Sequence, residues 1–307
     1  MPKPKVYTIS DAEIRSMQLI SNNNVLVRIV QKNVDRRTKG GIYLISPTDT
    51  DWQKDVHADR WGSVVKIPQY LKREKNHLWE TTCELKVGDR VWWDSMVSEN
   101  ADTLITPTYT YLLLDYFSLH VAKRDDEIIP LNGYQMFDLV SDESSSALAI
   151  KTGRFDARYG VLKHKGSLNN YLFDGCNDDD RIQVGDKCVF KLPPIMLEAE
   201  YHAVFGEKLR ISQLYNISAF IHDGVLNASI NHIVVEPVVD THSGGIEIPL
   251  HLRKPSGMGT IYSVHCPETE LVKGMEINYH ATSATTIEFE GKKLQVLHKD
   301  YVKYYKT

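Results

Sequence analysis

The residues of this 307-residue chain that could carry chemistry are mostly scattered, and few stand at the spacing that a known type of site requires. The densest group is an acidic run of Asp174, Asp178, Asp179 and Asp180, whose carboxylates could attract a divalent cation. Their spacing does not match the ligand positions of an EF-hand, so the simpler interpretation is a solvated loop. The histidines include no HExxH pair. The sequence therefore predicts no metal site.

The cysteines and glycines do not form a recognisable site either. Structural zinc sites show closely spaced cysteines and disulfide frameworks are dense in them, whereas the four cysteines here are far apart: Cys83, Cys176, Cys188 and Cys266. We expect free thiols in a reducing cytoplasm. No Walker loop is present, and Gly257-Met258-Gly259 lacks the third glycine and the strand–helix–strand setting of a dinucleotide site. The sequence predicts a protein without catalytic activity and without a cofactor.

The overall charge and hydropathy give no indication of a nucleic acid or a membrane as a partner. The formal net charge is −4, which is close to balance for this length. No apolar run is long enough for a transmembrane helix, and residues 1–6 lack the apolar stretch of a signal peptide. We expect a cytoplasmic protein, in the host cytoplasm or the virus particle if the chain is viral.

The chemistry that remains is that of binding another protein. A polar segment, residues 31–39, leads into Gly40-Gly41-Ile42-Tyr43-Leu44, and the chain repeats this pattern as Gly244-Gly245-Ile246-Glu247-Ile248. A flexible polar loop can place aliphatic side chains in an apolar groove of a partner, but ordering the loop costs roughly 1–2 kcal/mol per residue. Each contact is therefore weak, and several loops together restore affinity. The alternative is that Ile42 and Leu44 are inward-facing strand residues after a turn.

A threefold repeat is expected to position these segments. A turn-and-strand pattern recurs at residues 86–93, 183–190 and 272–279, each time with a glycine at the turn, because glycine tolerates positive φ. Each unit also has an opening strand, a second glycine and a terminal segment: the opening strands are 25–30, 134–140 and 232–238, the glycines are Gly62, Gly160 and Gly259, and the terminal segments are 111–121, 209–221 and 294–305. Many short strands separated by turns predict an all-β protein. The predicted modules span residues 25–124, 130–224 and 227–307, with short linkers at 123–127 and 222–224.

Residues 1–24 precede the repeat and contain a helix signal. Ser10-Asp11-Ala12-Glu13 has the pattern of a capping box, with Ser10 as the N-cap and Glu13 returning the hydrogen bond. Ile14, Met17 and Leu19 or Ile20 would then line one face of a short helix. This helix could dock on a barrel or on a neighbouring subunit.

The order of elements in the first module resembles the GroES (co-chaperonin) family, and the other modules follow the same order. The resemblance implies three tandem GroES-like small β-barrels with a short N-terminal helical extension. It also implies that an aliphatic tripeptide in a mobile loop contacts a chaperonin, while the barrels form a sevenfold dome. The positions that match the loop are Ile42, Tyr43 and Leu44 after Gly40 and Gly41, and Ile246, Glu247 and Ile248 after Gly244 and Gly245. Tyr43 and Glu247 depart from the usual aliphatic type, and the second module has only Leu148, Ala149 and Ile150 without a glycine pair.

Two functions follow as expectations. The first is a co-chaperonin-like ring or lid that forms a homo-oligomer, binds a GroEL-type chaperonin through its mobile loops and assists protein folding. The second is a non-catalytic structural component of a virus particle or another large assembly, because whole chains of three barrels do not divide into a sevenfold ring. A large, divergent gene of this type would suit a bacteriophage. GroES-like barrels also occur in zinc-dependent medium-chain dehydrogenases, but no Rossmann domain follows here and the cysteines do not fit their zinc sites.

Overall fold

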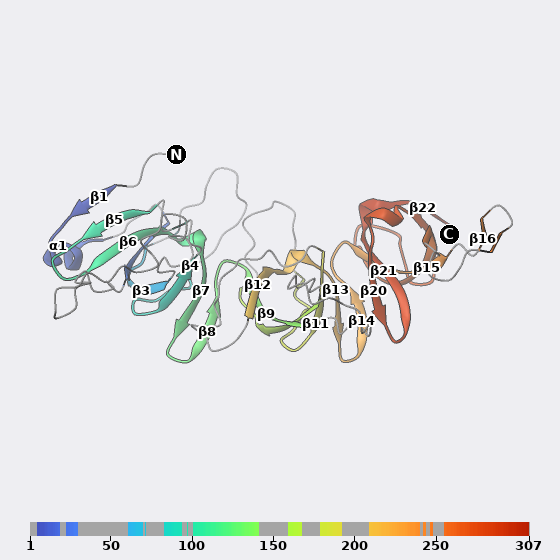
Figure 1. Cartoon of the computed structure of the whole chain (residues 1–307), viewed down its shortest axis with the longest axis horizontal. Helices are drawn as coiled ribbons and strands as arrows, with labels where there is room; N and C mark the ends of the chain where they lie inside the picture. The colour runs from blue at the N-terminus through green and yellow to red at the C-terminus, as the bar shows by residue number, and fades with distance from the viewer. Residues whose placement is uncertain are drawn as a thin grey trace, which may run out of the picture. The chain divides into compact units, whose positions relative to one another are not determined.

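The computed structural model describes residues 5–18, 23–29, 61–69, 71, 83–93, 97, 101–140, 159–167, 179–191, 209–239, 242–243, 246–247 and 255–306. Most of these residues lie in strands of three multistranded sheets, which confirms the predicted all-β class (Figure 1). Contacts divide the chain into two compact units, Met1–Gln135 with His164–Gly175 and Met136–Lys163 with Cys176–Thr307. Within the described residues the strand order of each sheet is open, so closed barrels stay a prediction.

The first sheet lies in the first unit and has eight strands. Its order is β1 (Val6–Thr8), β5 (Asp102–Ile105), β6 (Thr110–Asp115), β2 (Asn24–Ile29), β3 (Trp61–Lys66), β4 (Arg90–Trp93), β7 (Leu119–Arg124) and β8 (Glu127–Pro130). The pairings are antiparallel apart from β1 with β5, which is parallel. Its core includes the buried side chains of Val25, Trp93, Leu114 and Leu119, which come from four different strands.

The other two large sheets have six strands each. The order in the second sheet is β12 (Leu209–Gln213), β9 (Tyr134–Val140), β10 (Tyr159–His164), β11 (Lys187–Phe190), β13 (Ile217–His222) and β14 (Val225–Ala228). The order in the third sheet is β20 (Thr285–Phe289), β21 (Lys292–His298), β15 (His232–Val239), β18 (Pro255–His265), β19 (Glu276–Tyr279) and β22 (Val302–Lys306). The short strands β16 (His242–Ser243) and β17 (Ile246–Glu247) form a separate pair.

The three sheets share one strand order. The first contains the path β6-β2-β3-β4-β7, the second β12-β9-β10-β11-β13 and the third β21-β15-β18-β19-β22. In each sheet a 3-10 turn joins the two outer strands of that path: η3 (Tyr116–Ser118), η4 (Leu214–Asn216) and η7 (Lys299–Tyr301). A further 3-10 turn, η6 (Ala281–Ser283), precedes β20. The period read from the sequence therefore appears as a repeated topology, while the exact limits of the three modules stay a prediction.

The repeated glycine turn has the same geometry in all three sheets. Gly88, Gly185 and Gly274 have φ values of 100°, 98° and 93°, a region that other residues rarely enter. Their amides donate to the carbonyl oxygens of Val64, Leu162 and Ile261 at 2.8, 2.8 and 2.9 Å. The turn is thus bonded to the strand that carries the second repeated glycine, which explains why the two signals recur together.

The second repeated glycine permits a close approach between strands. A Cβ atom on Gly259 would lie 2.4 Å from Val235 Cγ1 and 2.6 Å from the carbonyl oxygen of Glu236. A Cβ atom on Gly62 would lie 2.5 Å from Val27 Cγ1, in the equivalent strand pair of the first sheet. These distances are shorter than any real Cβ contact, so only glycine fits without a backbone shift.

The two segments expected to be linkers are hairpin turns instead. Arg124 pairs with Glu127 across the β7–β8 hairpin, and His222 pairs with Val225 across the β13–β14 hairpin. Asp223 and Gly224 both have positive φ, as a tight two-residue hairpin turn requires. Asp-Gly between apolar runs is a strong hairpin signal that the sequence analysis missed. The chain passes to the next sheet a few residues later, at 131–133 and 229–231.

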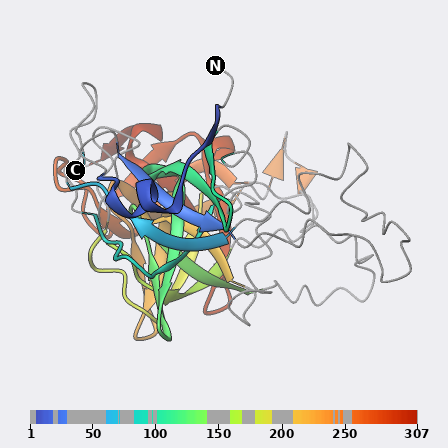
Figure 2. The same cartoon turned by 90° about the vertical axis from the view of Figure 1, so that its left-hand side faces the viewer.

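The expected N-terminal helix is confirmed as α1 (Asp11–Ser16), and so is its capping box. The Glu13 amide donates to Ser10 Oγ at 3.2 Å, and the Ser10 amide donates to Glu13 Oε2 at 2.8 Å. Ile14 is buried against the first sheet, so the helix docks on its own chain (Figure 2). Leu19 and Ile20 lie outside the described residues. No helix in the described part of the chain has the length and apolar character needed to span a bilayer.

Candidate partner-binding segments

The three segments predicted to contact a partner occupy the same connection in the three sheets. The first lies between β2 and β3, the second between β9 and β10, and the third between β15 and β18. Eleven of the thirteen predicted contact residues lie outside the described residues: Gly40, Gly41, Ile42, Tyr43, Leu44, Leu148, Ala149, Ile150, Gly244, Gly245 and Ile248. Ile246 and Glu247 form β17. The structure thus relates the segments by topology and leaves their contact role a prediction.

The third segment is the one with described structure inside it. His242 pairs with Glu247 and Ser243 with Ile246, so β16 and β17 form a small antiparallel hairpin. At the base of the segment Val239 pairs with Pro255, which keeps the two ends of the segment side by side. Val238 and Val239 expose 53% and 40% of their surface. Apolar side chains are therefore exposed where this segment leaves its sheet.

A carboxylate closes the glycine turn in the first and second sheets. Asp89 accepts the Lys86 amide at 2.7 Å and two guanidinium nitrogens of Arg124 at 2.9 and 2.8 Å. Asp186 accepts the Gln183 amide at 2.8 Å, and its carboxylate lies 2.7 Å from His222 Nδ1. The hydrogen bond to Asp186 raises the pKa of His222. These acids hold the turn and its neighbouring strand together, which is a structural role.

Asp179 departs from the solvated loop expected for the acidic run. Its side chain is 1% exposed and lies 2.9 and 2.7 Å from Nε and a terminal nitrogen of Arg181. It also accepts the Ile230 amide at 3.2 Å and the Ser229 hydroxyl at 3.3 Å. Burial alone would raise the pKa of Asp179, but the hydrogen bonds and charge of Arg181 outweigh it and lower that pKa. Asp179 therefore anchors the connection into the third sheet. Asp174 and Asp178 lie outside the described residues.

Glu84 holds the connection into the second sheet in the same way. Its carboxylate accepts the Asn132 amide at 3.0 Å and the Tyr116 hydroxyl at 2.8 Å. The buried Asn132 side chain donates in turn to the carbonyl oxygens of Tyr116 and Leu119 at 2.8 and 2.9 Å. Burial strongly raises the pKa of Tyr116, so its hydroxyl stays a donor. Sequence reasoning missed both anchors, because their partners lie about 50 residues away along the chain.

His232 makes the stability of the second unit dependent on pH. Its imidazole is buried, and Nδ1 donates to the Ile230 carbonyl oxygen at 2.7 Å. Burial, aided by the charge of Lys191, lowers the pKa of His232 to about 3. Because the folded pKa lies below the unfolded one, the stabilisation is complete above about pH 6.5 and declines as the pH falls toward 3.

We expect the free energy of unfolding to fall by about 2 kcal/mol more between pH 7.5 and 5 in the unmodified chain than in a His232→Gln variant. Urea unfolding at the two pH values measures this difference. The exposed His280→Gln change is the control for replacing a histidine of the same unit. An equal fall in the free energy of unfolding in the unmodified chain and in the His232→Gln variant would contradict the lowered pKa of His232.

The three described cysteines are free and at least half-buried. Cys188 and Cys266 are buried, and Cys83 is half-buried; all three are free. Burial raises the pKa of Cys266 to about 11, so the thiol is protonated near neutral pH. Within the part of the chain that the structure describes, no cluster of three or more histidine, cysteine or acidic side chains could hold a metal ion. Cys176 lies outside that part.

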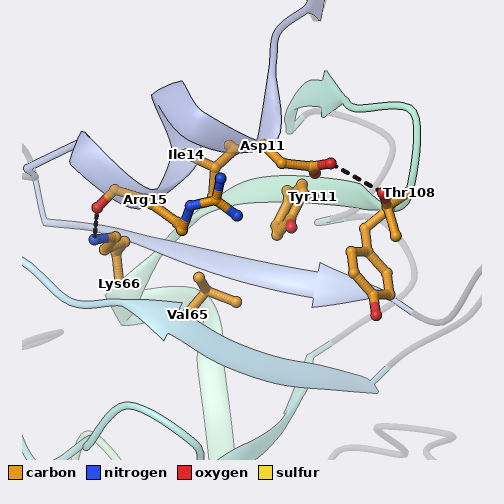
Figure 3. Close-up of a pocket in the computed structure, with 8 residues that line it drawn as sticks. Asp11, Ile14, Arg15, Val65, Lys66, Thr108 and Tyr111 are labelled. Carbon is orange, nitrogen blue, oxygen red and sulfur yellow. Dashed lines mark hydrogen bonds between the residues drawn. The ribbon is translucent and has the colours of Figure 1, made fainter.

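A pocket of about 400 Å³ lies beside α1 and was not predicted from the sequence (Figure 3). The lining residues are Asp11, Ile14, Arg15, Val65, Lys66, Thr108, Tyr109 and Tyr111. Thr108 Oγ1 donates to Asp11 Oδ2 at 2.9 Å, and Lys66 Nζ donates to the Arg15 carbonyl oxygen at 2.8 Å. Hydrogen bonds from Thr106 and Thr108 lower the pKa of Asp11. The one acid among the described residues that line the pocket is thus hydrogen-bonded to a residue of its own chain.

Neither a comparison with models of known protein families nor a comparison with curated protein sequences gives a match for this chain.

Proposed function

We propose that this protein is a non-catalytic, co-chaperonin-like binding protein built from three GroES-like modules. In this proposal the segment between the opening strand and the glycine strand of each module contacts a GroEL-type chaperonin. One observation carries it: three sheets with the same strand order place the candidate contact segments at the same connection. Segments at equivalent positions of equivalent modules are suited to equivalent sites on a symmetric partner.

The energetics favour repeated weak contacts over a single strong one. Burying an Ile or Leu side chain contributes roughly 1.5–3 kcal/mol, while ordering a flexible segment costs roughly 1–2 kcal/mol per residue. A single segment therefore binds weakly and releases readily. Several segments on one particle raise the effective concentration of the remaining contacts, which restores affinity without a large interface. The exposed Val238 and Val239 add apolar surface next to the third segment.

A second candidate function is a structural component of a virus particle or another large assembly. The observation that favours it is the apolar core shared by the second and third sheets, which includes Val189 from one and Val296 from the other. Modules fixed to one another within a chain suit a scaffold. The number of chains in the native particle separates the two functions: seven chains support the lid, and three, six or twelve support the scaffold.

The proposal is tested by mixing the purified protein with a GroEL-type chaperonin and ATP and following co-migration by size exclusion. We expect a complex that an Ile42→Asp, Ile246→Asp double variant weakens by at least roughly 10-fold, because it removes two aliphatic side chains that the proposed contact would bury. The control is Val225→Asp, an exposed residue in the β13–β14 hairpin, which should bind normally. The absence of a complex under conditions where an ordinary co-chaperonin binds would contradict the proposal.

A further inference from the structure

The second and third sheets dock through two apolar faces. The docking face of the second sheet consists of Tyr159, Val189, Ala219, Leu226 and Ala228. The receiving face of the third sheet consists of Val234, Ile287, Leu294 and Val296, with Tyr262 and Phe289 at its edge. Two hydrogen bonds flank the contact: the Ala228 amide donates to Ser263 Oγ at 3.0 Å, and the Glu288 amide donates to the Tyr159 hydroxyl at 3.4 Å.

The first sheet has the same receiving face. Leu26 pairs with Leu113 as Val234 pairs with Val296. Leu104 pairs with Tyr111 as Ile287 pairs with Leu294. Val65 follows Gly62 by three residues, as Tyr262 follows Gly259, so the two side chains are at equivalent positions. These five residues of the first sheet form one apolar cluster, and what covers them is the N-terminal segment, through Ile9, Ile14 and Met17.

The N-terminal segment also forms hydrogen bonds at the two strand positions where the docked second sheet forms them on the third sheet. Lys66 is the counterpart of Ser263, and its Nζ donates to the Arg15 carbonyl oxygen at 2.8 Å. Ile105 is the counterpart of Glu288, and its carbonyl oxygen accepts the Ile9 amide at 2.9 Å. Residues 5–17 therefore occupy on the first sheet the place that a whole sheet occupies on the third. We call this segment the cap.

The cap covers its face less completely than a docked sheet does. Its helix α1 has six residues, and only Ile14 of them is buried. The pocket of about 400 Å³ lies between the helix and the strands, bordered by Ile14, Val65 and Tyr111 (Figure 3). The hydrogen bonds of Asp11 with Thr108 and of Lys66 with Arg15 are exposed to water, where such bonds contribute little. The three-residue pairing of β1 with β5 is the main further attachment of the cap, so we expect its helix to be displaceable.

The corresponding face of the third sheet has a polar residue, Asn278, between two exposed large side chains. In the second sheet Tyr159 pairs with Val189 and Val189 with Ala219. The equivalent pairs in the third sheet are Met258 with Asn278 and Asn278 with Tyr304. Met258 and Tyr304 expose 38% and 56% of their surface. Within the described residues no strand pairs with the outer edge of β22, so this face lacks the residues that β14 adds to the second sheet.

We propose that the cap blocks head-to-tail assembly, and that its displacement lets the receiving face of the first sheet bind the exposed docking face on the third sheet of a second copy. The occupant is inferred from the internal contact, in which one repeat already docks on the next through the same positions. Because the face on the third sheet is smaller, the association is weaker than the internal contact and depends on concentration. The inference does not depend on a chaperonin partner.

Sedimentation velocity of full-length variants tests this proposal. Ile14→Asp loosens the cap, and we expect self-association at least about 10-fold stronger than that of the unmodified chain. Adding Tyr304→Asp should abolish the increase, whereas Tyr301→Asp, a tyrosine of η7 with similar exposure, should not. The double variant Ile14→Asp, Tyr304→Asp has an open receiving face and a blocked docking face. Mixed with the unmodified chain, it should form a one-to-one complex that grows no further.

A milder change keeps the test informative if Ile14→Asp prevents folding. Thr108→Val with Lys66→Met removes two exposed hydrogen bonds of the cap and should shift association in the same direction by less. Unchanged mass in variants that keep their β-sheet circular dichroism signal would overturn the proposal. Association that Tyr304→Asp does not reduce would overturn the assigned occupant, since two receiving faces would then be meeting each other.

Discussion

Replacing Asp179 with alanine is expected to lower the free energy of unfolding of the second unit by about 2–3 kcal/mol, because it removes the buried acceptor of several hydrogen bonds, including those from the partly exposed Arg181. The carboxylate is 1% exposed and receives hydrogen bonds from Arg181, Ser229 and the Ile230 amide. Without it, the Ile230 amide loses its acceptor at the point where the chain enters the third sheet. Urea unfolding followed by circular dichroism measures the loss.

The matched control for this change is Asp126→Ala in the β7–β8 hairpin. Asp126 is fully exposed and lies 3.9 Å from Lys123, so its removal should change stability by less than about 0.5 kcal/mol. The stabilisation by Asp179 should also disappear in acid, because its folded pKa lies below the unfolded value of about 3.9. A loss below about 1 kcal/mol in Asp179→Ala would show that the anchor is dispensable.

Replacing Gly259 with alanine is expected to destabilise the second unit by about 2–4 kcal/mol, as overpacking does when the backbone must move. The added methyl group would lie 2.4 Å from Val235 Cγ1 and 2.6 Å from the Glu236 carbonyl oxygen. A rotamer change of Val235 could relieve the first contact, but the second is with backbone. The β15–β18 pair must therefore separate at this point. Thermal and urea unfolding of the purified variant measure the effect.

Two other variants separate steric clash from the general effect of losing a glycine. Gly274→Ala introduces a methyl group into open space at φ 93°, so it should cost only about 1 kcal/mol of backbone strain. Thr260→Ala changes an exposed neighbour in the same strand and should be near neutral. If Gly274→Ala proved more destabilising than Gly259→Ala, the close approach of β15 and β18 would not be the reason for the glycine.

Features encoded by neighbouring residues could be predicted from the sequence. The glycine turns depend on backbone geometry at Gly88, Gly185 and Gly274, and the capping box of α1 depends on Ser10 and Glu13. The order of strands along the chain also followed from these local signals and their period, whereas their order within each sheet came from the structure. The hairpin at Asp223-Gly224 was equally local, but the same Asp-Gly pair also fits a short linker between modules, which is how it was interpreted.

Features that depend on distant residues could not be predicted in this way. In the sequence, nothing distinguishes Asp179 and Glu84 from other acidic residues. Their hydrogen bonds to the amides of Ile230 and Asn132 exist only in the folded chain. The docking of α1 depends on side chains such as Tyr111, almost 100 residues further on. For the candidate contact segments, the sequence supplied the residues and the structure supplied the common connection; the contact with a partner stays a prediction.

The shared core of the second and third sheets limits how such a chain can evolve. Deleting either repeat alone would leave its neighbour with an uncovered apolar face, on Val189 and Ala219 or on Val234 and Val296. In repeat proteins such a loss reduces solubility unless a capping element takes its place. A viable duplication or deletion must therefore keep each receiving face covered, either by another repeat or by a copy of the short N-terminal helix.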